Sequence, residues 1–127
     1  MEIVRRAVAA LNARDVDGYL ACCTEDVELH TPLEPFVGVY ERRDGIARWL
    51  GDVEDAAPDF QIVLRDAKAV GNDQVVAFAH LGSTGRASGI QLEGESINVY
   101  DLVEGKIRRT RVFLDHAEAL KVVGLEE

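Results

Sequence analysis

Apolar residues change their spacing along this chain near Phe60, and that change constrains the fold more than any other feature. After Phe60, apolar and polar residues alternate over residues 60–70, 74–84, 91–103 and 106–114, as expected for β-strands. The links between these stretches are short, at residues 71–73, 85–89 and 104–105. Because short links join neighbouring strands as hairpins, we expect four consecutive antiparallel strands.

Before Phe60 the apolar residues recur mostly at helical spacing. Helices are predicted over residues 3–13, over a short stretch that Asp15 caps and that reaches Cys23, and from Asp44 to a point before Pro58. Between the second and third helices, residues 27–31 alternate as a strand that stops at Pro32. A last short helix is expected over residues 116–123.

This order of elements, ααβα followed by a curved antiparallel sheet and a short C-terminal helix, indicates an α+β protein. We expect a cone-shaped α+β barrel in which the helices lie on the concave side of the sheet. Concave surfaces of this kind are where ligands bind, so the interior of the cone is the expected ligand site. The 127 residues show no repeat, linker or low-complexity tract, and we expect residues 1–127 to form a single domain.

Composition excludes several classes of partner. The formal net charge is −9, which disfavours binding to nucleic acid and to anionic membrane surfaces. No apolar run approaches the roughly 20 residues of a membrane helix, and the N-terminus lacks the apolar core of a signal peptide. Cys22 and Cys23 are neighbours, a poor arrangement for a disulfide, and two buried free thiols fit a reducing compartment. We therefore expect a cytoplasmic protein.

Several segments resemble the nuclear-transport-factor-2-like superfamily, in particular its SnoaL-like polyketide cyclase and ketosteroid-isomerase-like branch. The resemblance covers essentially the whole chain and rests on the order and spacing of four segments. These are residues 8–18 with their Asp-x-Asp-Gly turn, residues 26–32, residues 43–50, and the pair 104–107 and 113–115. The resemblance implies the cone-shaped fold but not a particular reaction, because one fold hosts many chemistries.

The acids and bases that the resemblance would supply are absent at the matching positions. Where ketosteroid isomerases have a first-helix Tyr, an Asp before the first-strand Pro and a sheet Asp, this chain has Ala7, Thr31 and Asn98. Limonene-epoxide-hydrolase-like enzymes use an Arg-x-Asp pair and a last-strand Asp, and here those positions match Ser96, Asn98 and Val112. The resemblance therefore favours a pocket without its usual catalytic set.

Alternation along each strand predicts which side chains face the cavity. If Asn98 points inward, then so do Ser96 and Tyr100, and on the last strand Arg108, Thr110, Val112 and Leu114. We place Val76, Phe78 and His80 on the inward face of the second long strand. The predicted ligand-binding residues are Leu11, Cys23, Thr31, Phe36, Trp49, Leu50, Ile62, Phe78, His80, Asn98, Tyr100 and Val112.

His80 is the inward candidate that titrates near neutral pH, which makes it the candidate general acid or base. Asn98 and Tyr100 are candidate catalytic donors to a carbonyl oxygen. Each of the three has a purely structural alternative, as a hydrogen-bonded interior residue. His30 is expected to point away from the cavity and His116 to be exposed. The histidines lack metal-ligand spacing, so neither a metal nor a cofactor is expected.

The last long strand is basic in an otherwise acidic chain. Alternation places Arg109 and Arg111 on the outer sheet face with Phe113. This face could form a homodimer, as the resemblance implies, or could be a solvated face whose charges are balanced by nearby Asp and Glu.

Three functions remain open from the sequence. The first is binding of a small, mostly apolar organic ligand in the cone. The second is a lyase, isomerase or cyclase that moves a proton next to a carbonyl, with His80 as acid or base. The third is a non-catalytic dimeric module that binds a protein partner through its sheet face.

Overall fold

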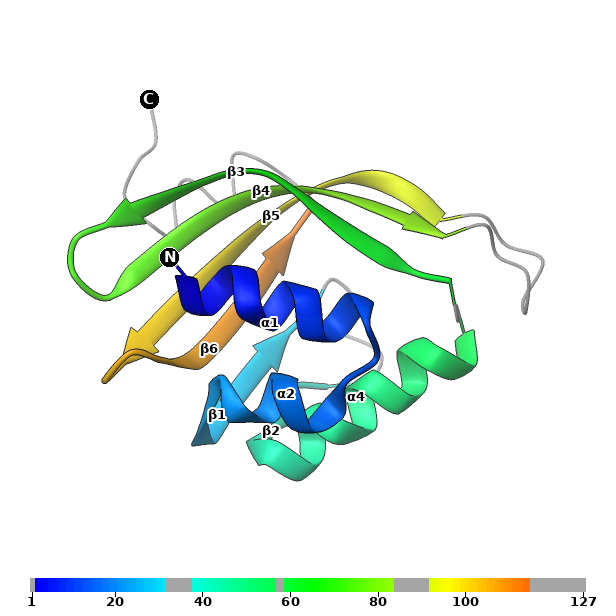
Figure 1. The fold of residues 1–127 in the computed structure, drawn as a ribbon, viewed down its shortest axis with the longest axis horizontal. Coiled ribbons are helices and arrows are strands. Elements are labelled where there is room, and N and C mark those ends of the chain that lie inside the picture. The colour runs from blue at the N-terminus through cyan, green and yellow to red at the C-terminus, as the bar shows by residue number, and fades with distance from the viewer. Residues whose placement is uncertain (1, 32–37, 57–58, 84–91, 115–127) are drawn as a thin grey trace.

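The computed structural model describes residues 2–31, 38–56, 59–83 and 92–114, and Figure 1 shows their arrangement. Its helices are α1 (Glu2–Asn12), α2 (Val16–Ala21) and α4 (Arg42–Ala56). Its strands are β1 (Cys23–His30), β2 (Tyr40–Glu41), β3 (Gln61–Val70), β4 (Gln74–Ser83), β5 (Leu92–Val103) and β6 (Lys106–Phe113). The predicted helix at residues 116–123 lies outside the described residues.

The six strands form one curved, mixed sheet in the order β2-β1-β6-β5-β4-β3. Strands β3 to β6 pair antiparallel in sequence order, which confirms the four predicted strands. β1 joins the sheet beside β6 and runs parallel to it, so the sheet is mixed rather than purely antiparallel. Its ends do not meet, since β2 and β3 are both edge strands, so the curved sheet is open. The α+β cone is confirmed.

All three described helices lie on the concave side of the sheet, as Figure 1 shows. The main core fills the space between them. It is built from the apolar face of α1, which includes Val4, Ala7 and Leu11, and from residues of α2, β1, α4 and the sheet. Since each fully buried aliphatic side chain contributes about 1.5–3 kcal/mol, this helix-to-sheet contact is the main source of stability.

The start of α2 follows the sequence prediction. Asp15 is the N-cap residue, and its carboxylate accepts a hydrogen bond of 3.0 Å from the Gly18 amide. A Cβ atom at position 18 would collide with the Asp15 carboxylate, which explains the glycine there. α4 differs from its prediction: it begins at Arg42, and the predicted cap Asp44 lies inside its first turn, where its carboxylate accepts from the Gly45 amide.

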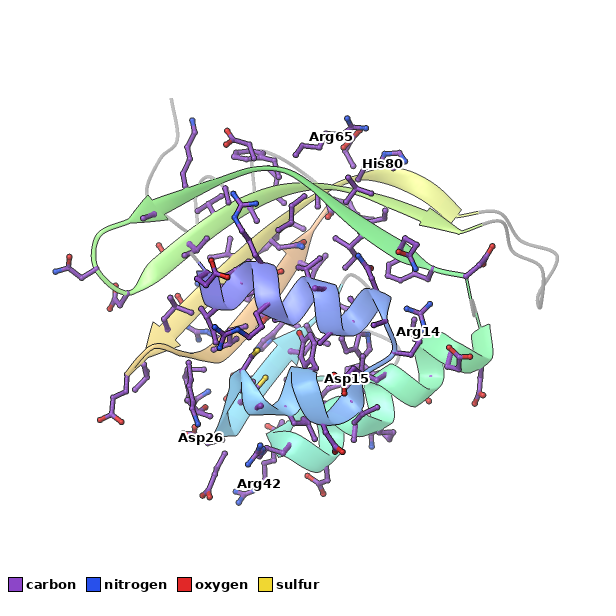
Figure 2. All side chains as sticks on the ribbon, in the orientation of Figure 1. Arg14, Asp15, Asp26, Arg42, Arg65 and His80 are labelled. Carbon is purple, nitrogen blue, oxygen red and sulfur yellow. The ribbon has the colours of Figure 1, made fainter. Side chains whose placement is uncertain are left out.

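Asn12 and Arg14, at the C-terminal end of α1, hold this helix against the edge strand β3 through hydrogen bonds. Asn12 donates to the Ile62 carbonyl and accepts from the Ile62 amide, both at 2.8 Å, as a neighbouring strand would. Arg14, labelled in Figure 2, donates to the Phe60 and Leu11 carbonyls at 2.8 Å. Its guanidinium also pairs with Glu54 of α4 at 2.8 Å. This corner joins α1, α4 and β3.

We predict that Asn12→Ala lowers the free energy of unfolding by about 1–3 kcal/mol, because it leaves both polar groups of Ile62 without their partner. Urea denaturation followed by circular dichroism measures the change. Arg5→Ala, on the exposed side of the same helix, is the control and should change stability by less than about 0.5 kcal/mol. Equal effects of the two substitutions would show that the Asn12 contact contributes nothing of its own.

Candidate functional site

Strand pairing decides which side chains share a face of the sheet, because directly opposed residues point to the same side. Asn98 of β5 lies opposite Ala77 of β4 and Val112 of β6. Tyr100 lies opposite Val75 and Thr110. Val75, Ala77 and Tyr100 all belong to the core beneath the helices, so this face is the concave one. The predicted inward orientation of Ser96, Asn98, Tyr100, Thr110 and Val112 agrees with this pairing.

The predicted inward orientation of Phe78 and His80 is wrong. Phe78 lies opposite Ile97 and His80 opposite Glu95, so both point to the convex face with Val76. The Nδ1 atom of His80 is 3.3 Å from a Glu95 carboxylate oxygen. Figure 2 shows His80 and Arg65 on the side of the sheet away from the helices. Alternation shows which residues of one strand share a face, but it does not show how two strands are aligned. The prediction aligned β4 with β5 one residue out of register, so it assigned Phe78 and His80 to the wrong face.

Arg108 is also not inward. The β5–β6 pairing shifts between Asp101 and Leu102, so that Ile107 opposes Leu102 while Arg109 opposes Asp101. Arg108 is the extra residue of this bulge. Its guanidinium pairs with Asp26 at 3.0 Å and with Glu28 at 3.5 Å. A bulge breaks strict alternation, which is why the sequence pattern misassigned this side chain.

Buried polar side chains gather on the concave face among apolar neighbours. We call Ser96, Asn98 and Tyr100 of β5 the polar ladder, because they occupy alternate positions of one strand. The Ser96 hydroxyl donates to Asn98 Oδ1 at 3.1 Å, and Asn98 Nδ2 donates to the Tyr100 hydroxyl at 3.4 Å. All three side chains are at most 3% exposed. A buried and hydrogen-bonded chain of this kind holds its members in fixed orientations.

Tyr19 of α2 and Thr110 of β6 extend this polar region. Their side chains are hydrogen-bonded, and the Tyr19 ring also meets Trp49 of α4, with ring centroids 5.9 Å apart and an interplanar angle of 59°. Tyr19 is only 5% exposed, although the sequence pattern does not place it at the site. α2 has six residues, too few for apolar spacing to indicate which of its side chains face the cone.

The polar ladder and its neighbours are uncharged. Burial raises the pKa of Tyr100 to about 12, and burial also raises the pKa of Tyr19 well above its usual range. Burial likewise raises the pKa of the Cys23 thiol to about 12. Both phenols therefore keep their protons at neutral pH and act as hydrogen-bond donors.

Most of the other predicted lining residues lie in the concave core or pack against it. Leu11, Cys23, Leu50 and Ile62 are buried in the concave core, and Trp49 and Val112 are partly exposed and pack against it. Thr31 follows the end of β1 and is partly exposed. Phe36 lies outside the described residues. The concave core therefore brings together most of the predicted apolar lining.

The convex face carries the predicted basic residues, each with an acidic partner in the same chain. Arg109 pairs with Asp101 at 2.8 Å and Arg111 pairs with the same carboxylate at 3.1 Å. His30 lies opposite Arg111, which confirms that it points outward, and its ring is 3.1 Å from Glu28. The hydrogen bond from His30 and the nearby Arg108 charge lower the pKa of Glu28.

Within the described ranges no three His, Cys, Asp or Glu side chains are grouped so that they could hold a metal ion. In those same ranges no helix has the length and apolar character needed to cross a membrane. A surface hollow of about 300 Å³ lies where β2 meets α4, lined by Val39, Glu41, Asp44, Gly45 and Arg48. This hollow shares no residue with the predicted set.

Comparison with known proteins gives one family and many similar folds. The family described as SnoaL-like domain matches residues 4–110. No protein with a curated description matches the chain. Among solved structures, an NTF2-like protein of unknown function from Burkholderia pseudomallei superposes with a TM-score of 0.80 at 20% identity, over 97% of this chain and 95% of that one.

Two further solved structures contain ligands. TerC co-crystallised with polyporic acid has a TM-score of 0.77 at 22% identity, over 97% of this chain and 96% of that one. A Mycobacterium tuberculosis protein in complex with estradiol-17beta-hemisuccinate has a TM-score of 0.78 at 15% identity, over 90% of this chain and 92% of that one. At these identities the likeness shows a shared fold.

The raised tyrosine pKa values predict loss of stability in strong alkali. An unfolded tyrosine titrates near 10, whereas burial raises the folded pKa of Tyr100 to about 12 and also raises those of Tyr19 and Tyr40. Folding therefore favours the protonated phenols. The contribution of Tyr100 to stability is complete below about pH 10 and is lost as the pH rises toward about 12. The contributions of Tyr19 and Tyr40 are likewise lost as the pH rises above the unfolded value.

Near-ultraviolet absorbance of tyrosinate tests this prediction, since the chain contains only these three tyrosines. In native protein we expect no tyrosinate at pH 10 and its appearance only together with unfolding. The same protein in concentrated urea should titrate near 10. A tyrosine that ionises near pH 10 while the protein remains folded would contradict the burial of the phenols.

Proposed function

Since the chain belongs to the SnoaL-like domain family, we propose that it binds a small, largely apolar organic molecule against the concave face of its sheet. The observation that carries this proposal is the polar ladder, a hydrogen-bonded set of neutral donors within an apolar core. Small-molecule sites are commonly built this way, with apolar walls and a few fixed polar groups. The ligands in TerC and in the Mycobacterium tuberculosis structure support this use of the fold.

The ligand would enter where the concave face is partly exposed. Val112, which lies opposite Asn98, and Trp49 of α4 are both only partly buried. At the other end of β5 and β6, Ile107, Cys22 and Cys23 are at most 2% exposed. A ligand that passes Val112 therefore reaches Asn98 first and the Tyr100 hydroxyl beside it.

Catalysis would depend on Asn98 and Tyr100 as donors to a carbonyl oxygen, as an oxyanion hole does. Among the described residues, the buried polar side chains are Ser96, Asn98 and Thr110, with no carboxylate or imidazole, and His80 points to the convex face. Proton abstraction next to a carbonyl needs such a base within hydrogen-bonding reach. Binding is therefore better supported than an isomerase, lyase or cyclase reaction based on His80.

We predict that Val112→Phe weakens ligand binding by about tenfold or more, because the larger ring occupies the space opposite Asn98. The measurement is thermal shift screening with a library of small apolar compounds, since a ligand that binds only the native state raises its melting temperature. Val103→Phe is the matched control, because Val103 lies at the end of β5 and is 50% exposed.

His80→Ala should leave every compound's thermal shift unchanged. Compounds that stabilise the wild type and Val112→Phe equally would place the site elsewhere. A loss of binding in His80→Ala would contradict the assignment of the site to the concave face.

We further propose that the chain forms a homodimer through its convex face. Phe78 and Phe113 are partly exposed there and Val63 is 54% exposed. The face carries both Arg109 and Asp101, so a two-fold axis could place opposite charges together. The intrachain pairing of these charges also fits a solvated face. A cytoplasmic location is proposed as well, because Cys22 and Cys23 are both buried free thiols.

Sedimentation equilibrium tests the dimer, and we expect a mass twice that of the 13.9 kDa chain. Val63→Glu should shift the mass toward the monomer, because it buries an unpaired charge in the interface. Val103→Glu, at a strand end and 50% exposed, is the control and should remain dimeric. A wild type that is monomeric at high protein concentration would overturn this part of the proposal.

A further inference from the structure

The hollow where β2 meets α4 differs in character from the concave face, because charged side chains form most of its lining. Its volume is about 300 Å³, and it is lined by Val39, Glu41, Asp44, Gly45 and Arg48. Position 45 contributes no side chain, and a Cβ atom there would lie 3.3 Å from the Tyr40 carbonyl carbon. The glycine therefore lets α4 pack closely against β2, and the hollow lies over this contact.

The Arg48 guanidinium is oriented by an aromatic ring and not by an acid. Its central carbon lies 5.1 Å from the centroid of the Tyr40 ring. Asp44 and Asp52 lie four residues away on either side of it, the spacing at which helical ion pairs form. However, Asp52 accepts a hydrogen bond from the Tyr40 hydroxyl at 3.0 Å, and Asp44 accepts from the Gly45 amide at 3.1 Å.

This arrangement leaves the guanidinium donors available. Within the part of the chain that the structure describes, Arg48 forms no ion pair and no hydrogen bond. A guanidinium has five N–H donors in one plane, a geometry that matches the two oxygens of a carboxylate. Arg48 can therefore hold a carboxylate in the hollow while its contact with Tyr40 fixes its orientation.

The carboxylates of the same hollow are available as well. Glu41 and Asp44 are exposed, and in the described ranges neither forms an ion pair. A ligand with only a carboxylate would meet two like charges beside Arg48, and a ligand with only an amine would leave the guanidinium without an acceptor. A short molecule that carries both groups complements both kinds of charge.

We propose that this hollow binds a small zwitterion of the amino-acid class. Its carboxylate accepts hydrogen bonds from Arg48, and its ammonium group lies beside the carboxylates of Glu41 and Asp44. The site is separate from the concave face, so it does not depend on the ligand proposed there. Because exposed ion pairs are weak, the selectivity among probes is more diagnostic than the affinity itself.

Three probes of similar length test the proposal: 4-aminobutyrate, butyrate and butylamine. They carry both charges, the negative charge alone and the positive charge alone. Each is titrated into the isotopically labelled full chain at constant ionic strength, and the amide NMR shifts of Glu41, Asp44 and Gly45 report binding in the hollow. We expect 4-aminobutyrate to bind about threefold or more tightly than either of the others, and added salt to reduce this preference.

Substitutions then assign the two charges. Arg48→Gln should remove the preference for 4-aminobutyrate over butylamine and keep the preference over butyrate. Glu41→Gln should reduce the preference over butyrate and keep the preference over butylamine. Arg5→Gln and Glu25→Gln are the matched controls, because both positions are exposed and lie outside the hollow, and they should change neither preference. Well-dispersed amide spectra establish that each variant is folded.

Each other result overturns the proposal. If 4-aminobutyrate shifts no amide of the hollow, or if butyrate or butylamine binds as tightly, the hollow is not a zwitterion site. A preference over butylamine that survives Arg48→Gln would show that the guanidinium does not hold the carboxylate. None of these results bears on the concave face, which Val112→Phe tests independently.

Discussion

The pairing of β4 with β5 is the constraint on which the rest of the structure depends. It runs antiparallel without interruption from Gln74 opposite Asp101 to Ser83 opposite Leu92. This register turns Ala77 and Ala79 toward the helices and Phe78 and His80 away from them. A slip of one residue would exchange the two faces, bringing large side chains under α1 and exposing small ones. The two alanines leave room for the polar ladder that lies opposite them.

Because the concave face is buried beneath the helices, its polar groups must satisfy one another. Ser96, Asn98 and Tyr100 do so along β5, and Tyr19 and Thr110 do so between α2 and β6. On the sheet, ion pairs such as Arg109 with Asp101 lie on the convex face, where they remain in contact with water. This division leaves a buried interior whose polar side chains are uncharged and hydrogen-bonded to one another.

The corner made by Asn12 and Arg14 covers the free edge of the sheet at β3. The sheet does not close, and its edge strand β3 would otherwise present free backbone groups to other chains. The Asn12 side chain occupies both backbone groups of Ile62, and Arg14 joins Phe60 to Glu54. The concave face therefore keeps its shape without the continuous hydrogen bonding of a barrel.

The sequence by itself determined the family, the α+β class and the strands β3 to β6. These follow from local spacing and from residue identity, which need no knowledge of distant contacts. Only the tertiary structure decided that His80 and Phe78 face outward, that Arg108 lies in a bulge, that β1 runs beside β6, and that Tyr19 reaches Thr110. The physical reason is that alternation fixes relative directions within one strand. Which face is buried, and which residue of another element it meets, depends on the register between strands and on the helices that cover them.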